Sequence, residues 1–139
     1  MVLNTNSQKD TKKRKMRKNS SSKIIIGIDP GSGGGIAVFS GKQLLNSTGC
    51  PDTVQKMSDY LRSLINSLEL EGIPISKIIV YIEKVHAFPT DARNSAFKFG
   101  RNFGMWLGIC STLKLTTIKV PPQTWIKHFN VPKMDKPNR

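Results

Sequence analysis

Two short, nearly continuous apolar runs restrict the fold of this 139-residue chain more than any other feature. Ile24–Asp29 reads IIIGID and Ile78–Glu83 reads IIVYIE, and both are rich in β-branched residues. Such runs are typical of interior strands that are buried on both faces of a sheet. Each run ends in a carboxylate, which is costly to bury unless it is paired or binds a cation. We therefore expect a sheet built around these strands, with Asp29 and Glu83 at their carboxyl ends.

The other segments alternate between strand-like and helix-like patterns. The glycine-rich residues 30–34 turn the chain, and hairpin strands follow at Gly35–Phe39 and near Gln43–Ser47. Asp52 is expected to cap a helix, with Gln55 as its capping-box partner. Helical spacing and apolar runs predict these later elements: a helix from Asp52 to Gly72, a helix from Asn94 or Ser95 to about Leu113, a strand at Thr116–Val120 and a short helix at Gln123–Phe129. The order predicts an α/β fold, a mixed sheet of three antiparallel strands and then parallel strands, flanked by helices.

Positive charge is the dominant feature of the composition. The formal net charge is +13, and both the N-terminal segment and the rest of the chain are basic. Residues 1–22 show no apolar periodicity, so we expect a disordered basic arm. Its KKRKMRK run is compatible with a nuclear localisation signal, a DNA-contacting arm or a solvated tail. The surplus on residues 23–139 attracts polyanions, so nucleic acid is the expected partner, with solubility alone as the alternative.

Several classes of protein are disfavoured by the sequence. Cys50 and Cys110 are far apart and lack metal-ligand spacing, so we expect reduced thiols rather than a disulfide framework or a zinc site. The longest apolar run, Ile24–Ile28, is too short to span a membrane. No apolar segment follows the basic N-terminus, which argues against a secretory signal. We therefore expect a soluble intracellular protein, cytoplasmic or nuclear.

Asp29 and Glu83 are the candidate metal ligands. If their strands are parallel neighbours, the two carboxylates lie side by side and repel each other unless a divalent cation bridges them. Mg²⁺, with Mn²⁺ as a substitute, takes such oxygen ligands together with water and substrate phosphate. The alternatives are that Asp29 only favours a glycine-rich turn, and that Glu83 forms a salt bridge with Lys84 or a cap.

Four segments together resemble the RuvC-type Holliday junction resolvases, especially the divergent branch common in phages and viruses: IIIGIDPGSGGGIAVF, YIEKVHAFP, SAFKFGRNFGMWLGI and IKVPPQTWIKHF. The similarity covers roughly residues 24–136. It implies a ribonuclease H-like fold and a homodimer that cuts four-way DNA junctions symmetrically with Mg²⁺. By this resemblance, Asp29 and Glu83 match the first two catalytic metal-binding acids.

The chain departs from the family pattern at its C-terminal end. Family members carry their remaining catalytic acids on a final helix, after a basic connecting segment, whereas VPKMDKPNR stops where that segment begins. We therefore expect residues 23–139 to form a ribonuclease H-like domain that is incomplete at the C-terminus, with the final helix missing. Weak metal binding and little or no cleavage by the chain alone would follow.

Basic and aromatic residues around Glu83 and later in the chain are the candidate DNA contacts. Phe88 precedes a proline in an expected loop and is our candidate for base stacking, although it could instead pack on the domain. The position of the family's junction-wedging aromatic is held by His86. The residues expected to contact phosphates are Lys84, Arg93, Lys98, Arg101 and Lys127.

Glycines recur every four residues in the second long helix, at Gly100, Gly104 and Gly108. They line one helix face, which predicts close packing of that helix against the sheet. The large apolar residues of the same helix are interpreted as core or subunit-interface residues: Phe97, Phe103, Trp106 and Leu107.

Three functions are compatible with these residues. The first is a Mg²⁺-dependent, structure-selective DNA endonuclease that resolves Holliday junctions, or its inactive truncated relative. The second is a non-catalytic nucleic-acid-binding module that keeps the fold and the basic face. The third begins from the glycine-rich hairpin, which is also similar to the phosphate loop of actin-like ATPases and sugar kinases. Those proteins need two such domains, and the length of this chain argues against them.

Overall fold

The computed structural model describes residues 22–31, 33–84 and 92–128 of the chain. Within these ranges the elements follow the predicted order, with one additional 3₁₀ helix: β1 (Ile24–Ile28), β2 (Gly35–Ser40), β3 (Gln43–Gly49), α1 (Val54–Leu70), η1 (Ile75–Lys77), β4 (Ile78–Glu83), α2 (Arg93–Thr112), β5 (Thr116–Val120) and α3 (Pro122–His128). The described helices include none that is long and apolar enough to cross a membrane. The proposed basic arm, His86 and Phe88 lie outside the described residues.

The five described strands form one mixed sheet in the order β3-β2-β1-β4-β5. β1 is antiparallel to β2, and β2 is antiparallel to β3. β1 is parallel to β4, and β4 is parallel to β5. The predicted sequence of three antiparallel strands and then parallel strands is therefore confirmed, and β1 and β4 are both interior strands.

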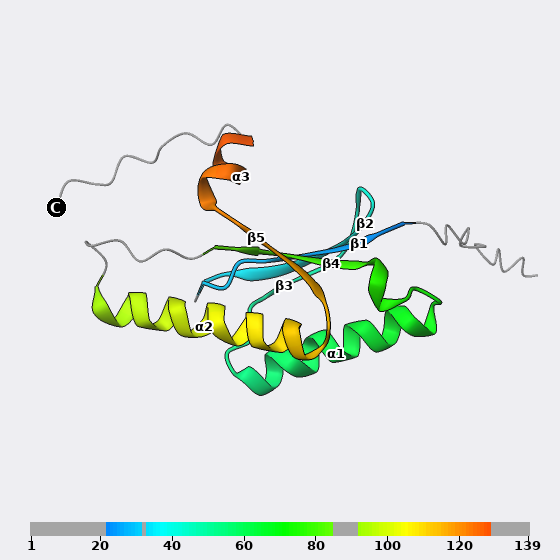
Figure 1. Cartoon of the computed structure of the whole chain (residues 1–139), viewed down its shortest axis with the longest axis horizontal. Coiled ribbons are helices and arrows are strands. Elements are labelled where there is room, and N and C mark those ends of the chain that lie inside the picture. The colour runs from blue at the N-terminus through cyan, green and yellow to red at the C-terminus, as the bar shows by residue number, and fades with distance from the viewer. Residues whose placement is uncertain (1–21, 32, 85–91, 129–139) are drawn as a thin grey trace, which may run out of the picture.

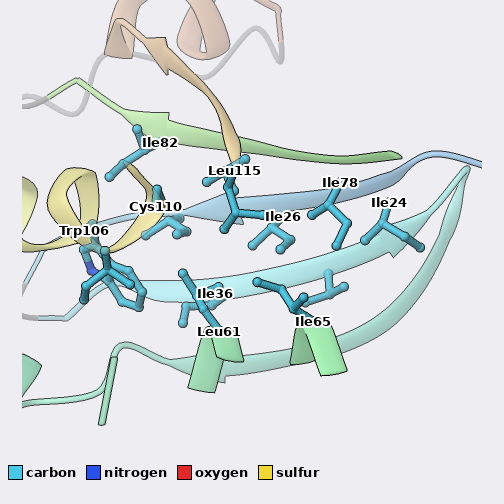
Figure 2. Packing of buried hydrophobic residues seen from close by; sticks show 14 of the residues in the cluster. Ile24, Ile26, Ile36, Leu61, Ile65, Ile78, Ile82, Trp106, Cys110 and Leu115 are labelled. Atoms are coloured by element: carbon cyan, nitrogen blue, oxygen red, sulfur yellow. The ribbon is translucent and has the colours of Figure 1, made fainter. Parts of the chain in front are cut away.

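The core lies on one face of this sheet. Side chains alternate along a strand, and the inward set of β1 and β4 is fully or almost fully buried. α1 and α2 lie together on that face, as Figure 1 shows, while α3 lies on the other side of the sheet, beyond the end of β5. Figure 2 shows the side chains of the strands meeting those of the two helices: Ile24, Ile26, Ile36, Ile78 and Ile82 from the sheet, and Leu61, Ile65, Trp106 and Cys110 from α1 and α2.

The prediction that the two interior strands are buried on both faces is wrong for the described part of the chain. Ile25 and Ile79 point to the second face and are only half-buried, and Tyr81 is exposed. The apolar character of these positions reflects β propensity and partial cover rather than a second core layer. The second face therefore remains accessible beside the carboxyl ends of β1 and β4.

The N-cap of the first long helix lies one residue later than predicted. Thr53 is the N-cap of α1, and its hydroxyl accepts a hydrogen bond from the main-chain N–H of Lys56. Asp52 instead pairs with the Lys56 ammonium at 2.8 Å, and Gln55 donates to Asp59. The predicted end is confirmed, because Gly72 follows the helix with φ of +83°. Aspartate and threonine are both preferred N-cap residues, with aspartate ranked slightly higher, so the residue types at positions 52 and 53 favour the wrong one of the two.

The second long helix corrects two further predictions. α2 begins after Ala92, which makes no side-chain cap, so neither Asn94 nor Ser95 caps it. Its glycine stripe does not face the sheet: Gly100, Gly104 and Gly108 are exposed, and a Cβ atom on any of them would have no neighbour within 4 Å. Trp106 is instead the buried residue of this part of the helix. The glycine spacing thus marks an exposed face of α2, where Gly104 and Gly108 line an open groove beside α1.

Phe97, Phe103 and Leu107 divide between the core and the surface of α2. Phe103 and Leu107 are partly buried against the core, as interpreted from the sequence. Phe97 is 70% exposed and is not a core residue of the described structure. It lies near the start of the helix, beyond the edge of the core.

We predict that Gly108→Ala stabilises the protein by about 0.8–1 kcal/mol, because Gly is that much less favourable than Ala inside a helix and the new methyl group meets no neighbour. The change is measured as the free energy of unfolding in urea. The contrasting variant is Gly41→Ala, which should destabilise the protein because Gly41 has φ of +58°. A destabilising effect of Gly108→Ala would contradict the exposed position of this helix face.

Candidate metal centre and nucleic-acid interface

The strand register places Asp29 and Glu83 next to each other. Ile28 and Ile82 are direct partners across β1 and β4, and the two acids follow them by one residue each. Neighbouring strands are about 4.8 Å apart. Because side chains alternate, both acids project away from the core face on which Ile28 and Ile82 are buried. The expected parallel pairing of the two strands is confirmed, whereas the chemical role of the acids stays a prediction.

The Asp29 turn is held by main-chain hydrogen bonds. The N–H of Asp29 donates to the carbonyl of Gly35 at 2.9 Å, and the N–H of Gly31 donates to Oδ1 of Asp29 at 3.0 Å. The second of these is the turn-forming bond that the simpler interpretation of Asp29 predicts. Asp29 is exposed, and Oδ2 has no hydrogen-bond donor among the described residues. One oxygen of the carboxylate is therefore fixed and the other remains available to a ligand.

Position 34 requires glycine, because the main chain there passes close to the main chain of Asp29 and leaves no room for a side chain. A Cβ atom at Gly34 would lie 2.1 Å from the main-chain oxygen of Asp29, which is far inside van der Waals contact. Phe99 of α2 packs on the same turn, because its ring carbon would lie 3.2 Å from a Cβ on Gly31. The N-terminal half of α2 is thereby placed beside the carboxyl end of β1 (Figure 1).

Cys50 supports this turn from the end of β3. Its thiol donates a hydrogen bond to the main-chain carbonyl of Asp29, with 3.0 Å between Sγ and oxygen. Burial and, next, the negative charge of Asp29 raise the pKa of Cys50, while the indole N–H of Trp106 lowers it. The thiol therefore stays protonated at neutral pH and remains a donor. The Trp106 Nε1 atom is buried and makes no hydrogen bond of standard geometry with the described residues, so its effect on Cys50 is a weak polar contact.

Glu83 is held by a residue that the sequence analysis did not single out. The indole N–H of Trp125, on α3, donates to Oε1 of Glu83 at 3.1 Å. No salt bridge between Glu83 and Lys84 is found, although both residues are among those that the structure describes. The sequence contains only an indirect indication of this contact. β5 runs parallel to β4, so the segment that follows β5, which contains Trp125, begins at the same edge of the sheet as Glu83.

The donor set at this edge suits a hard divalent cation with few protein ligands. Across the described ranges no group of three or more His, Cys, Asp or Glu side chains could hold a metal ion. Mg²⁺ is commonly held by one or two carboxylates together with waters and substrate phosphates. Asp29 and Glu83 provide two such carboxylates with no described cationic side chain paired to either. The residues present therefore fit Mg²⁺ or Mn²⁺ as a site that substrate phosphates complete.

The predicted phosphate-contacting residues are exposed on three segments of the chain. Lys84 follows Glu83 directly and is exposed, and its main-chain N–H donates to the carbonyl of Val120 at 2.8 Å. Arg93, Lys98 and Arg101 are exposed on the N-terminal half of α2, and Lys127 is exposed on α3. Lys98 adjoins Phe99, which packs against the Asp29 turn. Their contact with DNA stays a prediction.

Comparison with solved structures establishes the fold. The chain is similar to T. thermophilus RuvC in complex with a Holliday junction substrate, with a TM-score of 0.54 and 15% identity, over 78% of this chain and 71% of that chain. Another Thermus thermophilus RuvC structure gives a TM-score of 0.48 at 16% identity, covering 82% and 73% of the two chains. YeaZ from Pseudomonas aeruginosa gives 0.43 at 14% identity, covering 81% and 56%. No protein-family model and no curated protein matches the sequence. The first similarity and the strand order confirm the predicted ribonuclease H-like α/β fold.

We predict that Gly34→Ala destabilises the protein by about 1–3 kcal/mol, because the added methyl group forces the Asp29 turn to move. The matched control is Gly33→Ala, in the same turn, where a Cβ has no neighbour within 4 Å. Urea unfolding of both variants measures the difference. Equal stabilities for the two variants would show that the turn does not approach Asp29 as described.

Proposed function

We propose that this protein is a Mg²⁺-dependent, structure-selective DNA endonuclease that acts on Holliday junctions. The observation that carries the proposal is that Asp29 and Glu83 directly follow Ile28 and Ile82, which are partners across β1 and β4. The resemblance to RuvC supports it, because the similar solved structure is a complex with a Holliday junction substrate. We further propose that the protein works as a homodimer, since symmetric cleavage of a junction needs two sites.

The two carboxylates supply the charge of the proposed site. Among the described residues no donor contacts Oδ2 of Asp29 or Oε2 of Glu83, whereas the other oxygen of each accepts a hydrogen bond from an N–H group. These two oxygens would hold the cation on the accessible face of the sheet. A bound Mg²⁺ supplies Lewis acidity toward a phosphate oxygen and lowers the pKa of bound water. The side chains themselves position the cation and balance its charge.

The exposed basic residues supply the proposed DNA-binding surface. Lys84 directly follows β4, Lys98 and Arg101 lie on α2, and Lys127 lies on α3, and the two helices lie on opposite faces of the sheet (Figure 1). Lysine and arginine contacts to phosphates fix the position of a DNA duplex without reading its sequence. We therefore propose that junction selectivity comes from the shape of the junction rather than from base contacts.

A second function is a non-catalytic module that binds branched DNA. It is favoured by the absence, in the parts of the chain that the structure describes, of a cluster of three or more metal-ligating side chains. The two functions make different predictions for Mg²⁺: the enzyme cuts in its presence, whereas the binding module only binds.

We predict that Asp29→Asn abolishes cleavage of a four-way junction in Mg²⁺ and leaves junction binding in Ca²⁺ unchanged or tighter. The substitution removes a charge and little volume, so the binding surface is kept. Gel assays on a four-way junction and a matched duplex measure both quantities. Glu69→Gln, an exposed position on α1, is the control for loss of one negative charge. Cleavage that survives Asp29→Asn would overturn the proposed site, and junction-selective binding without cleavage by the wild type would favour the binding module.

We also predict that Lys98→Ala and Arg101→Ala each weaken junction binding and reduce its salt dependence. The plot of log affinity against log salt has a negative slope, and each lost phosphate contact should make that slope less steep by about 0.9. The control is Lys42→Ala, in the turn between β2 and β3, at the opposite end of β1 from Asp29. Equal slopes for these three variants and the wild type would contradict a DNA interface on α2.

A further inference from the structure

We propose that Trp125 is a positioning residue for the metal site: its indole N–H fixes Oε1 of Glu83 and so presents Oε2 to the cation. The proposal rests on the proposed function of Asp29 and Glu83 as metal ligands. It assigns a role to a residue of α3 that lies 42 positions from its partner in the sequence.

The position of Trp125 follows from the sheet. Val120 is the last residue of β5 and pairs in parallel with Glu83, the last residue of β4. α3 begins two residues later, at Pro122, so its first turn emerges at the edge of the sheet where the acids lie. The Nε1 atom of Trp125 reaches Oε1 of Glu83 at 3.1 Å, a normal hydrogen-bond distance.

The chemistry of the donor suits a metal ligand. An indole N–H is a neutral donor with no accepting capacity, so it orients the carboxylate without cancelling its charge as a lysine or arginine would. Asp29 is held in the same way, by the neutral main-chain N–H of Gly31 on Oδ1. Each acid thus has one oxygen held by a neutral donor and one oxygen without a donor among the described residues. This arrangement keeps both negative charges, at adjacent positions, available to a shared cation.

The competing explanation is that Trp125 only attaches α3 to the sheet. α3 contains no buried residue, and Trp125 itself is 37% exposed. A purely structural role predicts that losing the N–H group lowers the stability of the protein and leaves its metal affinity unchanged. Trp125→Phe keeps an aromatic ring and removes the donor, so measuring both metal affinity and stability of this variant separates the two roles.

The test measures metal binding and does not depend on cleavage. We predict that Trp125→Phe weakens Mn²⁺ binding by about 10–100-fold, the usual effect of losing an outer hydrogen bond to a metal ligand. Electron paramagnetic resonance of free Mn²⁺ gives the dissociation constant, and circular dichroism confirms that the thermal midpoint is unchanged. Ile126→Ala, on the same helix, is the control for disturbance of α3, and its Mn²⁺ affinity should equal that of the wild type.

Nuclear magnetic resonance gives a second readout. The chain has two tryptophans, so its proton–nitrogen spectrum contains two indole signals. Titration with Mg²⁺ should shift the Trp125 signal, which Trp125→Phe identifies by its absence, while the signal of buried Trp106 serves as the internal reference. Asp29→Asn should abolish the shift.

The outcomes distinguish this inference from the proposed function. If Asp29→Asn loses Mn²⁺ binding but Trp125→Phe binds as tightly as the wild type, the positioning role is overturned and the metal site stands. If the wild type binds Mn²⁺ no better than Asp29→Asn, the proposed metal site itself fails, and the role of Trp125 fails with it. Weaker binding by Trp125→Phe with unchanged stability supports the proposal.

Discussion

The parallel pairing of β1 with β4 is the interaction on which the rest of the structure depends. It aligns Ile24 with Ile78 and Ile28 with Ile82, so that the buried side chains of both strands form one continuous apolar surface. α1 and α2 cover that surface, and their own apolar stripes complete the core (Figure 2). The same register carries the chain one residue further into Asp29 and Glu83. The packing of the core and the placement of the two acids therefore have a single cause.

The carboxyl edge of the sheet differs from the core in how it is stabilised. Main-chain and neutral side-chain donors surround the two acids, including the N–H of Gly31, the thiol of Cys50 on the carbonyl of Asp29, and the indole of Trp125. Such donors fix geometry without neutralising charge, whereas an ion pair would do both.

The differences between sequence expectation and structure have physical reasons. Asp52 and Thr53 are both preferred N-cap residues, and the main-chain geometry of α1 selects Thr53 even though aspartate ranks slightly higher. The glycines of α2 were assigned to the sheet side because small residues permit close packing, yet Trp106 and Ile109 form the buried side of the helix. The apolar residues on the second face of β1 and β4 predicted a second buried layer. In the described structure that face is only partly covered, because strand propensity and burial favour the same residue types.

The sequence by itself determined the elements, their order and the position of an acid at the end of each interior strand. These properties depend on the local spacing of apolar residues and on the residue types in each segment, so they can be derived without knowing which segments are in contact. Only the tertiary structure decided which face of the sheet stays accessible, that Cys50 supports the Asp29 turn, and that Trp125 holds Glu83. These contacts join residues 21 and 42 positions apart, and they arise from strand register and helix placement, which no local pattern specifies.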